Sequence, residues 1–362
     1  MADTTFVNGV TLTDEDWFND VNRLHYTIFG DPSNAVTALA NLSAVAPGQG
    51  ILLNGQIVTS VGSNALTIAI KGADGNDPSS TNPVSVAFRS ATLTTSGYTI
   101  RKITAALSLV VSSGSTLGHA SALACHLFVY LIDNSGTVEL AVSNLPPDYP
   151  GTFANTRLIS TTAEGGAGAA DSATGIYSTT ARSNVPWVCV AMCKSTQTTA
   201  GTWAANMTQV DQAPFSIPTF PVQASLGSNQ TISDNVTTKL SLDSEAFDPD
   251  GVFDNATNYR YRPAVAGYYR ATVSLGIAEG NDGGLIGAYG YVNGSQQFRD
   301  EEPCSLTSAG SSYSRCANGL VLLNGTSDYL EAYCYQNRGS SASALSSPNR
   351  TSLVVERVSG GK

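Results

Sequence analysis

One stretch of the chain limits the possible fold more than any other, residues 252–269, with the sequence VFDNATNYRYRPAVAGYY. Its pattern predicts a short strand that ends at Phe253, a turn, and a second strand that contains Tyr259 and Tyr261. Pro263 cannot donate a ladder hydrogen bond and marks a corner after the second strand. A pair of short strands followed by a corner is typical of an antiparallel β-domain.

The chain then continues into a longer strand, which begins near Gly267 and alternates between apolar and polar residues from Tyr269 onward. A side-chain period of two places Tyr268 and Tyr269 on opposite faces of this strand. We expect Tyr269 to lie in the domain core, with Leu275 and Ile277 on the same face. Gly267 allows the backbone to pass close to a neighbouring segment.

The spacing of Phe-Asp, Ala-Thr, Tyr and Ala-Gly-Tyr-Tyr in this stretch resembles the core signature of the complement component 1q globular head. That head is a jelly roll related to the tumour-necrosis-factor family. Residues 328–332 and 352–356 resemble two further strands of the family, so the match covers residues 223–358. The resemblance implies a homotrimer, in which one sheet of each protomer packs about the threefold axis. The residues assigned to the trimer interface or to the jelly-roll core are Phe253, Tyr259, Tyr261, Gly267, Tyr268, Tyr269, Leu275 and Tyr333.

The composition restricts the class of protein. The 362 residues are 42% hydrophobic and only 13% charged, with a net charge of −10. Phosphate repulsion therefore disfavours a nucleic-acid partner. No apolar run reaches the length of a membrane span, and the N-terminus lacks the basic and apolar regions of a signal peptide. We expect a rigid, β-rich protein that is made in a host cytoplasm, without membrane insertion, and that leaves the cell by assembly.

The N-terminal segment predicts an amphipathic helix. Thr13 and Asp16 form a capping box in its aspartate form, and Gly30 with Pro32 ends the helix. A single apolar stripe runs along it, and such a helix is not stable alone. It must pack on its own copies in a trimer or on a partner surface, or fold back on the first β-domain. The residues assigned to attachment and assembly are Trp17, Phe18, Val21, Leu24 and Ile28.

Residues 5–29 also resemble a leader segment found at the N-termini of tailed-bacteriophage tail and fibre proteins. This resemblance implies an attachment segment.

Residues 61–210 contain many short strands with Gly and Ser punctuation, which predicts a β-sandwich. Three prolines between Asp211 and Pro221 indicate a semi-rigid linker. The expected organisation is an attachment helix (1–30), a connector with a short hairpin at Asn54-Gly55 (31–60), a β-sandwich domain (61–210), a Pro-rich linker (211–222) and a complement component 1q-like jelly roll (223–362).

Residues suited to catalysis are few. Of the three histidines, His25 lies on the predicted helix, and His119 and His126 flank Cys125 without zinc-ligand spacing. No nucleophile motif, metal-protease motif or phosphate loop is present. The six cysteines are expected to be free thiols, although Cys304 and Cys316 would meet if the segment between them were a hairpin. We therefore expect no enzymatic activity and no catalytic residues.

A calcium site is the one cofactor hypothesis that the sequence offers. Asp248, Asp250 and Asp254, with the backbone of Gly251, have the oxygen ligands that calcium prefers. Asp-Pro-Asp-Gly is also a strong turn sequence, and turn formation is the favoured explanation. The prediction therefore has no required cofactor.

Together these features predict a structural protein of a bacteriophage virion, a homotrimeric tail fibre or spike component. Its N-terminus would bind other tail or neck proteins, and its C-terminal domain would bind a host cell-surface glycan or protein. The alternatives are a head or neck decoration protein of the virion, a glycan-cleaving tailspike, and a free-standing secreted lectin-like binder.

Overall fold

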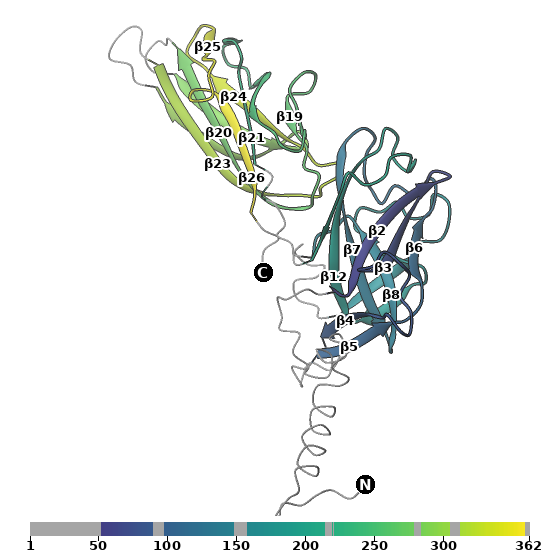
Figure 1. Ribbon diagram of the computed structural model, residues 1–362. Helices are drawn as coiled ribbons and strands as arrows, with labels where there is room; N and C mark the ends of the chain where they lie inside the picture. Colours follow the sequence, from purple (N-terminus) through teal and green to yellow (C-terminus); the bar gives the residue numbers. More distant parts are fainter. Residues whose placement is uncertain are drawn as a thin grey trace, which may run out of the picture.

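The computed structural model describes residues 52–89, 98–147, 158–213, 219, 221–278, 284–304 and 312–358. In these ranges the chain is all-β, as the sequence predicts, and no helix of membrane-crossing length occurs in them. The predicted attachment helix, with Trp17, Phe18, Val21, Leu24 and Ile28, lies outside the described residues. The described strands form two modules, an N-terminal one in blue to teal and a C-terminal one in green to yellow (Figure 1).

The N-terminal module contains thirteen strands. They are β1 (Leu52–Leu53), β2 (Gly55–Gly62), β3 (Ala65–Gly72), β4 (Val84–Arg89), β5 (Tyr98–Ile103), β6 (Leu107–Val111), β7 (Ala124–Asn134), β8 (Thr137–Ser143), β9 (Ile159–Ala163), β10 (Tyr177–Ser178), β11 (Arg182–Val185), β12 (Trp187–Thr196) and β13 (Gln209–Gln212).

A seven-stranded sheet with the order β11-β9-β10-β8-β7-β12-β13 is the centre of this module. The three-stranded sheets β2-β3-β6 and β1-β4-β5 supply further layers, and their buried aliphatic side chains share one core with those of β7 and β12. Trp203 is fully buried in this core, and its Nε1–H donates a hydrogen bond to the carbonyl of Ser115 at 3.0 Å. The predicted β-sandwich is therefore a layered β-module with one main core.

The start of the module differs from the sequence prediction. No hairpin forms at Asn54: β1 pairs with β4, whereas β2 pairs with β3 across the turn at Ser63 and Asn64. Asn54 adopts a positive φ of 57° where the chain passes from one sheet to the other. Strand β2 consequently runs through residue 60, which the sequence assigned to the end of the connector, and it buries Ile57 in the core.

The C-terminal module contains the remaining strands. They are β14 (Val222–Ser225), β15 (Gln230–Ile232), β16 (Thr238–Lys239), β17 (Ser244–Phe247), β18 (Phe253–Asp254), β19 (Arg260–Tyr261), β20 (Gly267–Ala278), β21 (Leu285–Val292), β22 (Ser295–Pro303), β23 (Ser312–Leu323), β24 (Leu330–Gln336), β25 (Ala342–Ala344) and β26 (Ser352–Arg357).

Two antiparallel sheets build this module. In the first sheet, neighbouring strands follow the order β17-β14-β26-β20, and β23 pairs along the other edge of β20. In the second sheet the order is β18-β19-β24-β21-β22. The chain crosses between the sheets so that the first and last strands of the module, β14 and β26, are neighbours. This strand order is that of a jelly roll, the fold expected for residues 223–358.

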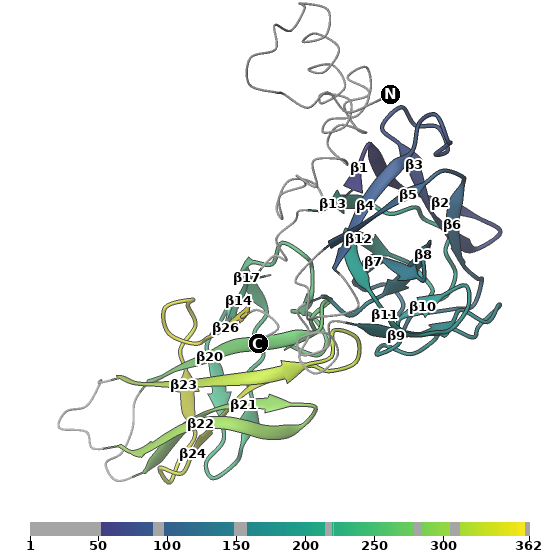
Figure 2. The same ribbon diagram turned by 90° about the horizontal axis from the view of Figure 1, so that it is seen from below.

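Strand β20 lies at the centre of the first sheet and shows why the sequence folds in this way (Figure 2). Its alternate residues Tyr269, Ala271, Val273, Leu275 and Ile277 are all fully buried between the two sheets. The residues between them point away from the core, so that the strand has one apolar face and one mixed face. The alternation detected in the sequence therefore sets which face of the sheet is covered.

The two modules pack directly on each other. Val265 and Ala266, in the segment before β20, belong to the same buried cluster as Phe128 and Tyr130 of the N-terminal module. In the other direction, Ala124 of the N-terminal module packs against the jelly-roll core. The jelly roll is therefore docked to its neighbour by apolar contacts as well as joined to it through the linker region.

Candidate binding surfaces

The outer face of the first jelly-roll sheet carries two exposed leucines on β23. Tyr268 of β20 pairs with Leu322, and Arg270 pairs with Leu320, so these side chains are neighbours on the face directed away from the core. Leu320 is 63% exposed and Leu322 is 43% exposed, and Phe247 at the opposite edge of the sheet is also exposed. We call Tyr268, Leu320 and Leu322 the apolar face. Burial of its exposed leucines against another surface would lower the free energy of the system.

Polar side chains next to the apolar face bind one another. Arg270 forms an ion pair of 3.1 Å with Glu356, and the hydroxyl of Thr272 donates to the side chain of Asn318 at 2.7 Å. These groups can remain paired when the leucines are covered. The face therefore combines a small apolar centre with a polar border, which is the usual anatomy of a protein interface.

Several of the residues assigned to interface or core lie inside the jelly roll. Tyr261 and Tyr269 are fully buried, with ring centroids 5.6 Å apart, and the Tyr269 hydroxyl donates to the carbonyl of Val265 at 2.5 Å. Phe253 and Leu275 are buried in the same core cluster. Burial raises the pKa of Tyr261 well above its usual value, so this hydroxyl stays neutral.

The other assigned residues occupy different places. Tyr259 directly precedes β19 with a positive φ of 46°. At Gly267 a Cβ would lie 2.6 Å from Nε of Arg357, so glycine leaves room for a guanidinium that donates to the carbonyl of Ala266 at 3.2 Å. Tyr268 is half-buried on the apolar face, whereas Tyr333 is half-buried on the outer face of the other sheet. The structure therefore does not bring Tyr268 and Tyr333 together.

The candidate calcium ligands have other roles in the structure. Asp254 accepts hydrogen bonds from the backbone N–H of Ala256 and of Thr257 in the turn between β18 and β19. Partial burial would raise its pKa, but these bonds and those from Asn258 outweigh that effect and lower the pKa to about 2. Asp248 accepts from the N–H of Phe253, and Asp250 forms an ion pair with Lys194. Within the described ranges, no group of three or more acidic, histidine or cysteine side chains is arranged to hold a metal ion.

The Lys194–Asp250 ion pair is also a polar contact between the modules, because Lys194 belongs to β12 and Asp250 precedes β18. His126 of β7 is buried beside this pair. Burial lowers the pKa of His126 to about 4, and the nearby Lys194 acts in the same direction, against Asp250 and Asp211. His126 is consequently neutral near pH 7.

Burial shifts the pKa of the second buried histidine and of several thiols in the described residues. His119 is buried against the ring of Trp203 at a centroid distance of 5.0 Å, and burial lowers its pKa. All six cysteines are free, as expected, and burial raises the pKa of Cys125, Cys193 and Cys334 to about 12. Thiols with such pKa values stay protonated and are poor nucleophiles near pH 7.

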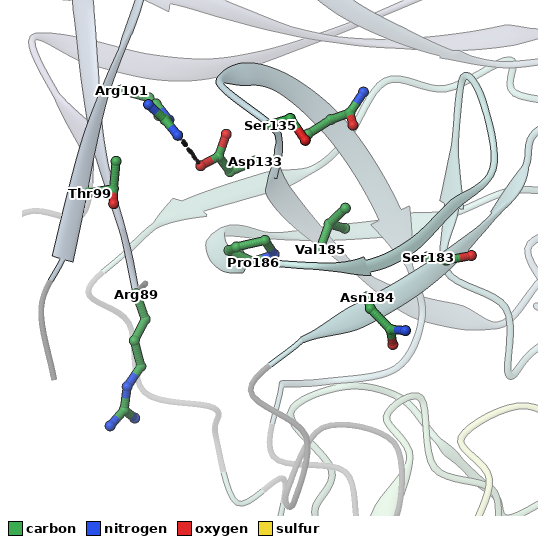
Figure 3. A pocket seen from close by; sticks show the side chains of 10 residues that line it. Arg89, Thr99, Arg101, Asp133, Ser135, Ser183, Asn184, Val185 and Pro186 are labelled. Carbon is green, nitrogen blue, oxygen red and sulfur yellow. Dashed lines mark hydrogen bonds and ion pairs between the residues drawn. The ribbon is translucent and has the colours of Figure 1, made fainter. Parts of the chain in front are cut away.

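An open cavity of about 380 Å³ lies in the N-terminal module between β4, β5, the β7–β8 turn and β11 (Figure 3). Its one acidic lining residue, Asp133, binds Arg101 at 2.9 Å and accepts from the N–H of Gly136 at 2.8 Å. The rest of the lining comes from Arg89, Thr99, Asn134, Ser135, Ser183, Asn184, Val185 and Pro186. A single carboxylate already bound to arginine cannot form the pair of acids that most glycosidases need.

Sequence reasoning missed Leu320, Leu322 and the Lys194–Asp250 contact. The segment that contains the two leucines reads GLVLL, and a continuous apolar run gives no indication of which side chains point outward. The ion pair joins residues far apart in the sequence, and no local pattern identifies its partners.

No protein-family model and no curated protein sequence matches the chain. Solved structures similar to it include an Eiger TNF from S. frugiperda, with 9% identity, a TM-score of 0.32, and coverage of 40% of this chain and 96% of that chain. The PRD1 vertex protein P5 has 16% identity and a TM-score of 0.28, with coverage of 40% and 99%. A protein of the T13 IBDV viral particle has 9% identity and a TM-score of 0.24, with coverage of 84% and 67%. The jelly-roll assignment stands on the strand order alone, and these likenesses carry no argument about function.

Proposed function

We propose that the chain is a structural protein of a bacteriophage virion, a homotrimeric tail fibre or spike component. Its N-terminal segment attaches it to other tail or neck proteins, and its jelly roll is presented for binding to the host surface. The proposal draws on the resemblance of residues 5–29 to phage tail and fibre leaders, and on the signature that begins at Val252.

The observation that carries the assembly part is the apolar face. Leu320 is the most exposed large hydrophobic side chain in the described residues, Leu322 is also exposed, and the two lie on the same face of β23. The jelly roll has a complete core of its own and does not need a partner in order to fold. We infer that copies of this sheet pack on one another, and the threefold order follows the complement component 1q resemblance.

We also propose that the protein binds without catalysis. The buried thiols are protonated, His119 packs against the ring of Trp203, and Asp133 is the one acid in the large cavity. Repeated copies on a particle supply avidity, so that each single site can remain weak. Purified protein incubated with host capsule or lipopolysaccharide should leave the length of the polysaccharide chains unchanged, as seen on gels or by mass spectrometry.

Removal of the N-terminal segment tests the attachment role. We expect the chain lacking residues 1–30 to remain folded and trimeric but to be absent from purified phage particles, as measured by immunogold electron microscopy with antibody against the jelly roll. The full-length chain is the control and should label the tail. Normal incorporation of the truncated chain, or label confined to the head, would contradict this proposal.

A further inference from the structure

The outer face of the second jelly-roll sheet carries a group of tyrosines. Tyr289 and Tyr291 come from β21, and Tyr333 and Tyr335 come from the adjacent strand β24. Tyr289 pairs directly with Tyr333, and Tyr335 lies opposite Gly287, which has no side chain to cover it. We call these four tyrosines the tyrosine platform. It covers the face of the jelly roll opposite to the apolar face.

The rings of the platform form a connected surface. The centroids of Tyr291 and Tyr333 are 4.3 Å apart with an angle of 36° between the ring planes, and Tyr289 lies 6.5 Å from Tyr291. Tyr289 is only 3% exposed and forms the base, whereas Tyr291, Tyr333 and Tyr335 are half-buried. Neighbouring positions along a strand face are about 7 Å apart, so the platform is a shallow surface rather than a deep pocket.

Hydrogen bonds hold three of the rings in place. The Tyr289 hydroxyl donates to Glu301, the Tyr335 hydroxyl donates to Asn235 at 2.6 Å, and the Tyr333 hydroxyl lies 3.4 Å from Glu331. Each hydroxyl that donates in this way retains an oxygen that can accept a bond from a ligand. Fixed rings lose little conformational freedom when a ligand binds, which favours binding.

Five charged groups around the platform already have partners. Glu331 pairs with Lys239, Glu301 pairs with Arg299 at 3.2 Å, and Arg260 stacks over the ring of Tyr329 at 4.5 Å. A strongly anionic or cationic ligand would have to compete with these partners. A neutral ligand rich in hydroxyl groups can bind the acceptor oxygens and lay its C–H surfaces on the exposed rings without disturbing any ion pair.

We propose that the tyrosine platform is a binding site for a neutral saccharide chain. The biological role of this site rests on the proposed function, because it would make the host-surface ligand a polysaccharide. A protein partner is the other possible occupant of an aromatic surface. The platform presents tyrosine rings together with hydroxyl oxygens such as that of Tyr335, whereas the apolar face presents the exposed leucines Leu320 and Leu322, so the platform suits a hydroxylated sugar better than an apolar protein surface.

The test uses the full-length protein on an array of purified bacterial surface polysaccharides together with maltoheptaose and chitohexaose. The best neutral binder is then measured by isothermal titration calorimetry. Removal of one of two neighbouring half-buried rings, in Tyr291→Ala or Tyr333→Ala, should weaken binding at least about tenfold, because an aromatic surface is lost. Tyr291→Phe retains the ring and should bind within about threefold of the original protein.

Val110→Ala is the matched control, since Val110 is an exposed strand residue of the N-terminal module, and it should bind as the original protein does. Circular dichroism melts of all variants separate a lost site from a lost fold. Absence of binding to every neutral saccharide, or binding that survives both alanine variants, would overturn the proposal. Binding to host cells that is abolished by protease and unaffected by periodate would identify a protein partner and would also overturn it.

This outcome is separate from that of the proposed function. Affinity of the purified protein for saccharide does not require a virion, so a protein absent from phage particles would still bind through the platform. Conversely, a protein found on the tail that binds no saccharide retains its structural role and loses only the platform site.

Discussion

The two outer faces of the jelly roll differ in the kind of side chain that they expose to solvent. On the apolar face, Leu320 and Leu322 are exposed and polar neighbours such as Arg270 already have partners. On the tyrosine platform, three of the four rings are half-buried, and the hydroxyls of Tyr289 and Tyr335 donate to Glu301 and Asn235. Binding at the first face would be favoured mainly by the removal of leucine side chains from water. Binding at the second face would replace bound water with a hydroxylated ligand.

If both proposals hold, one fold separates assembly from recognition. Both faces are built by the same period of two along a strand, and each is the reverse side of a sheet that covers a common core. Residue choice at the outward positions, leucine on β23 and tyrosine on β21 and β24, gives the two faces different chemistry. The proposed assembly through one sheet would therefore leave the other sheet free for the proposed recognition.

The largest expected effect comes from a charge placed on the apolar face. Leu320→Asp would bury an unpaired carboxylate between protomers, so the dissociation constant of the trimer should rise at least about a hundredfold. Analytical ultracentrifugation at micromolar concentration measures it. Val236→Asp is the control, because Val236 is also an exposed aliphatic residue but lies outside the apolar face. If both variants sediment as the original protein does, the apolar face is not the interface.

A second prediction concerns the stability of the fold at low pH. It depends on His126, which is buried at the junction between the two modules. The pKa of His126 in the folded protein is about 4, below the usual 6.5, so the unfolded chain binds the proton first as the pH falls. This group therefore stabilises the fold fully above pH 6.5 and loses that contribution between pH 6.5 and pH 4. We expect a loss on the order of 2 kcal/mol by pH 4.5.

Thermal denaturation at pH 7 and pH 4.5 measures this loss. His126→Gln should reduce the difference between the two pH values, because glutamine does not titrate. His119 has a lowered pKa for the same reason, contributes with the same sign, and is present in both proteins. An unchanged difference in the His126→Gln variant would show that another group controls the acid response.

The smallest expected effect compares a tyrosine hydroxyl inside the jelly roll with one on the platform. Tyr269→Phe leaves the buried Val265 carbonyl without this donor and should lower the free energy of unfolding by about 1–2 kcal/mol. Tyr335→Phe removes a hydroxyl at the exposed edge and should change it by less than about 0.5 kcal/mol. Urea denaturation of the two variants measures both values. Equal losses would mean that the platform is as firmly built as the core.

The sequence predicted those parts of the molecule that depend on local periodicity. The position of Tyr269 with Leu275 and Ile277 on one face followed from alternation, and the jelly-roll fold followed from the signature around Phe253. The two outer faces did not follow, because each needs the register between strands. Tyr289 and Tyr291 became neighbours of Tyr333 only through the pairing of β21 with β24.

The junction between the modules could not be predicted for a related reason. Val265 and Ala266 belong to a short apolar segment that resembles any other part of a jelly-roll core in the sequence. Their burial against Phe128 and Tyr130 depends on how two separate modules meet. Likewise, Asp250 had the pattern of a turn or a calcium ligand, and its partner Lys194 is 56 positions away.

The bond from Tyr269 to Val265 has a mechanical consequence. The backbone carbonyl of Val265 accepts a hydrogen bond from the Tyr269 hydroxyl in the jelly-roll core. The side chain of Val265 packs into the cluster shared with the N-terminal module. A pull on the jelly roll therefore travels through packed side chains into the neighbouring module and does not fall on the proline-rich connection alone. Under tension the two modules should therefore move together as one stiff unit and transmit force from one end to the other.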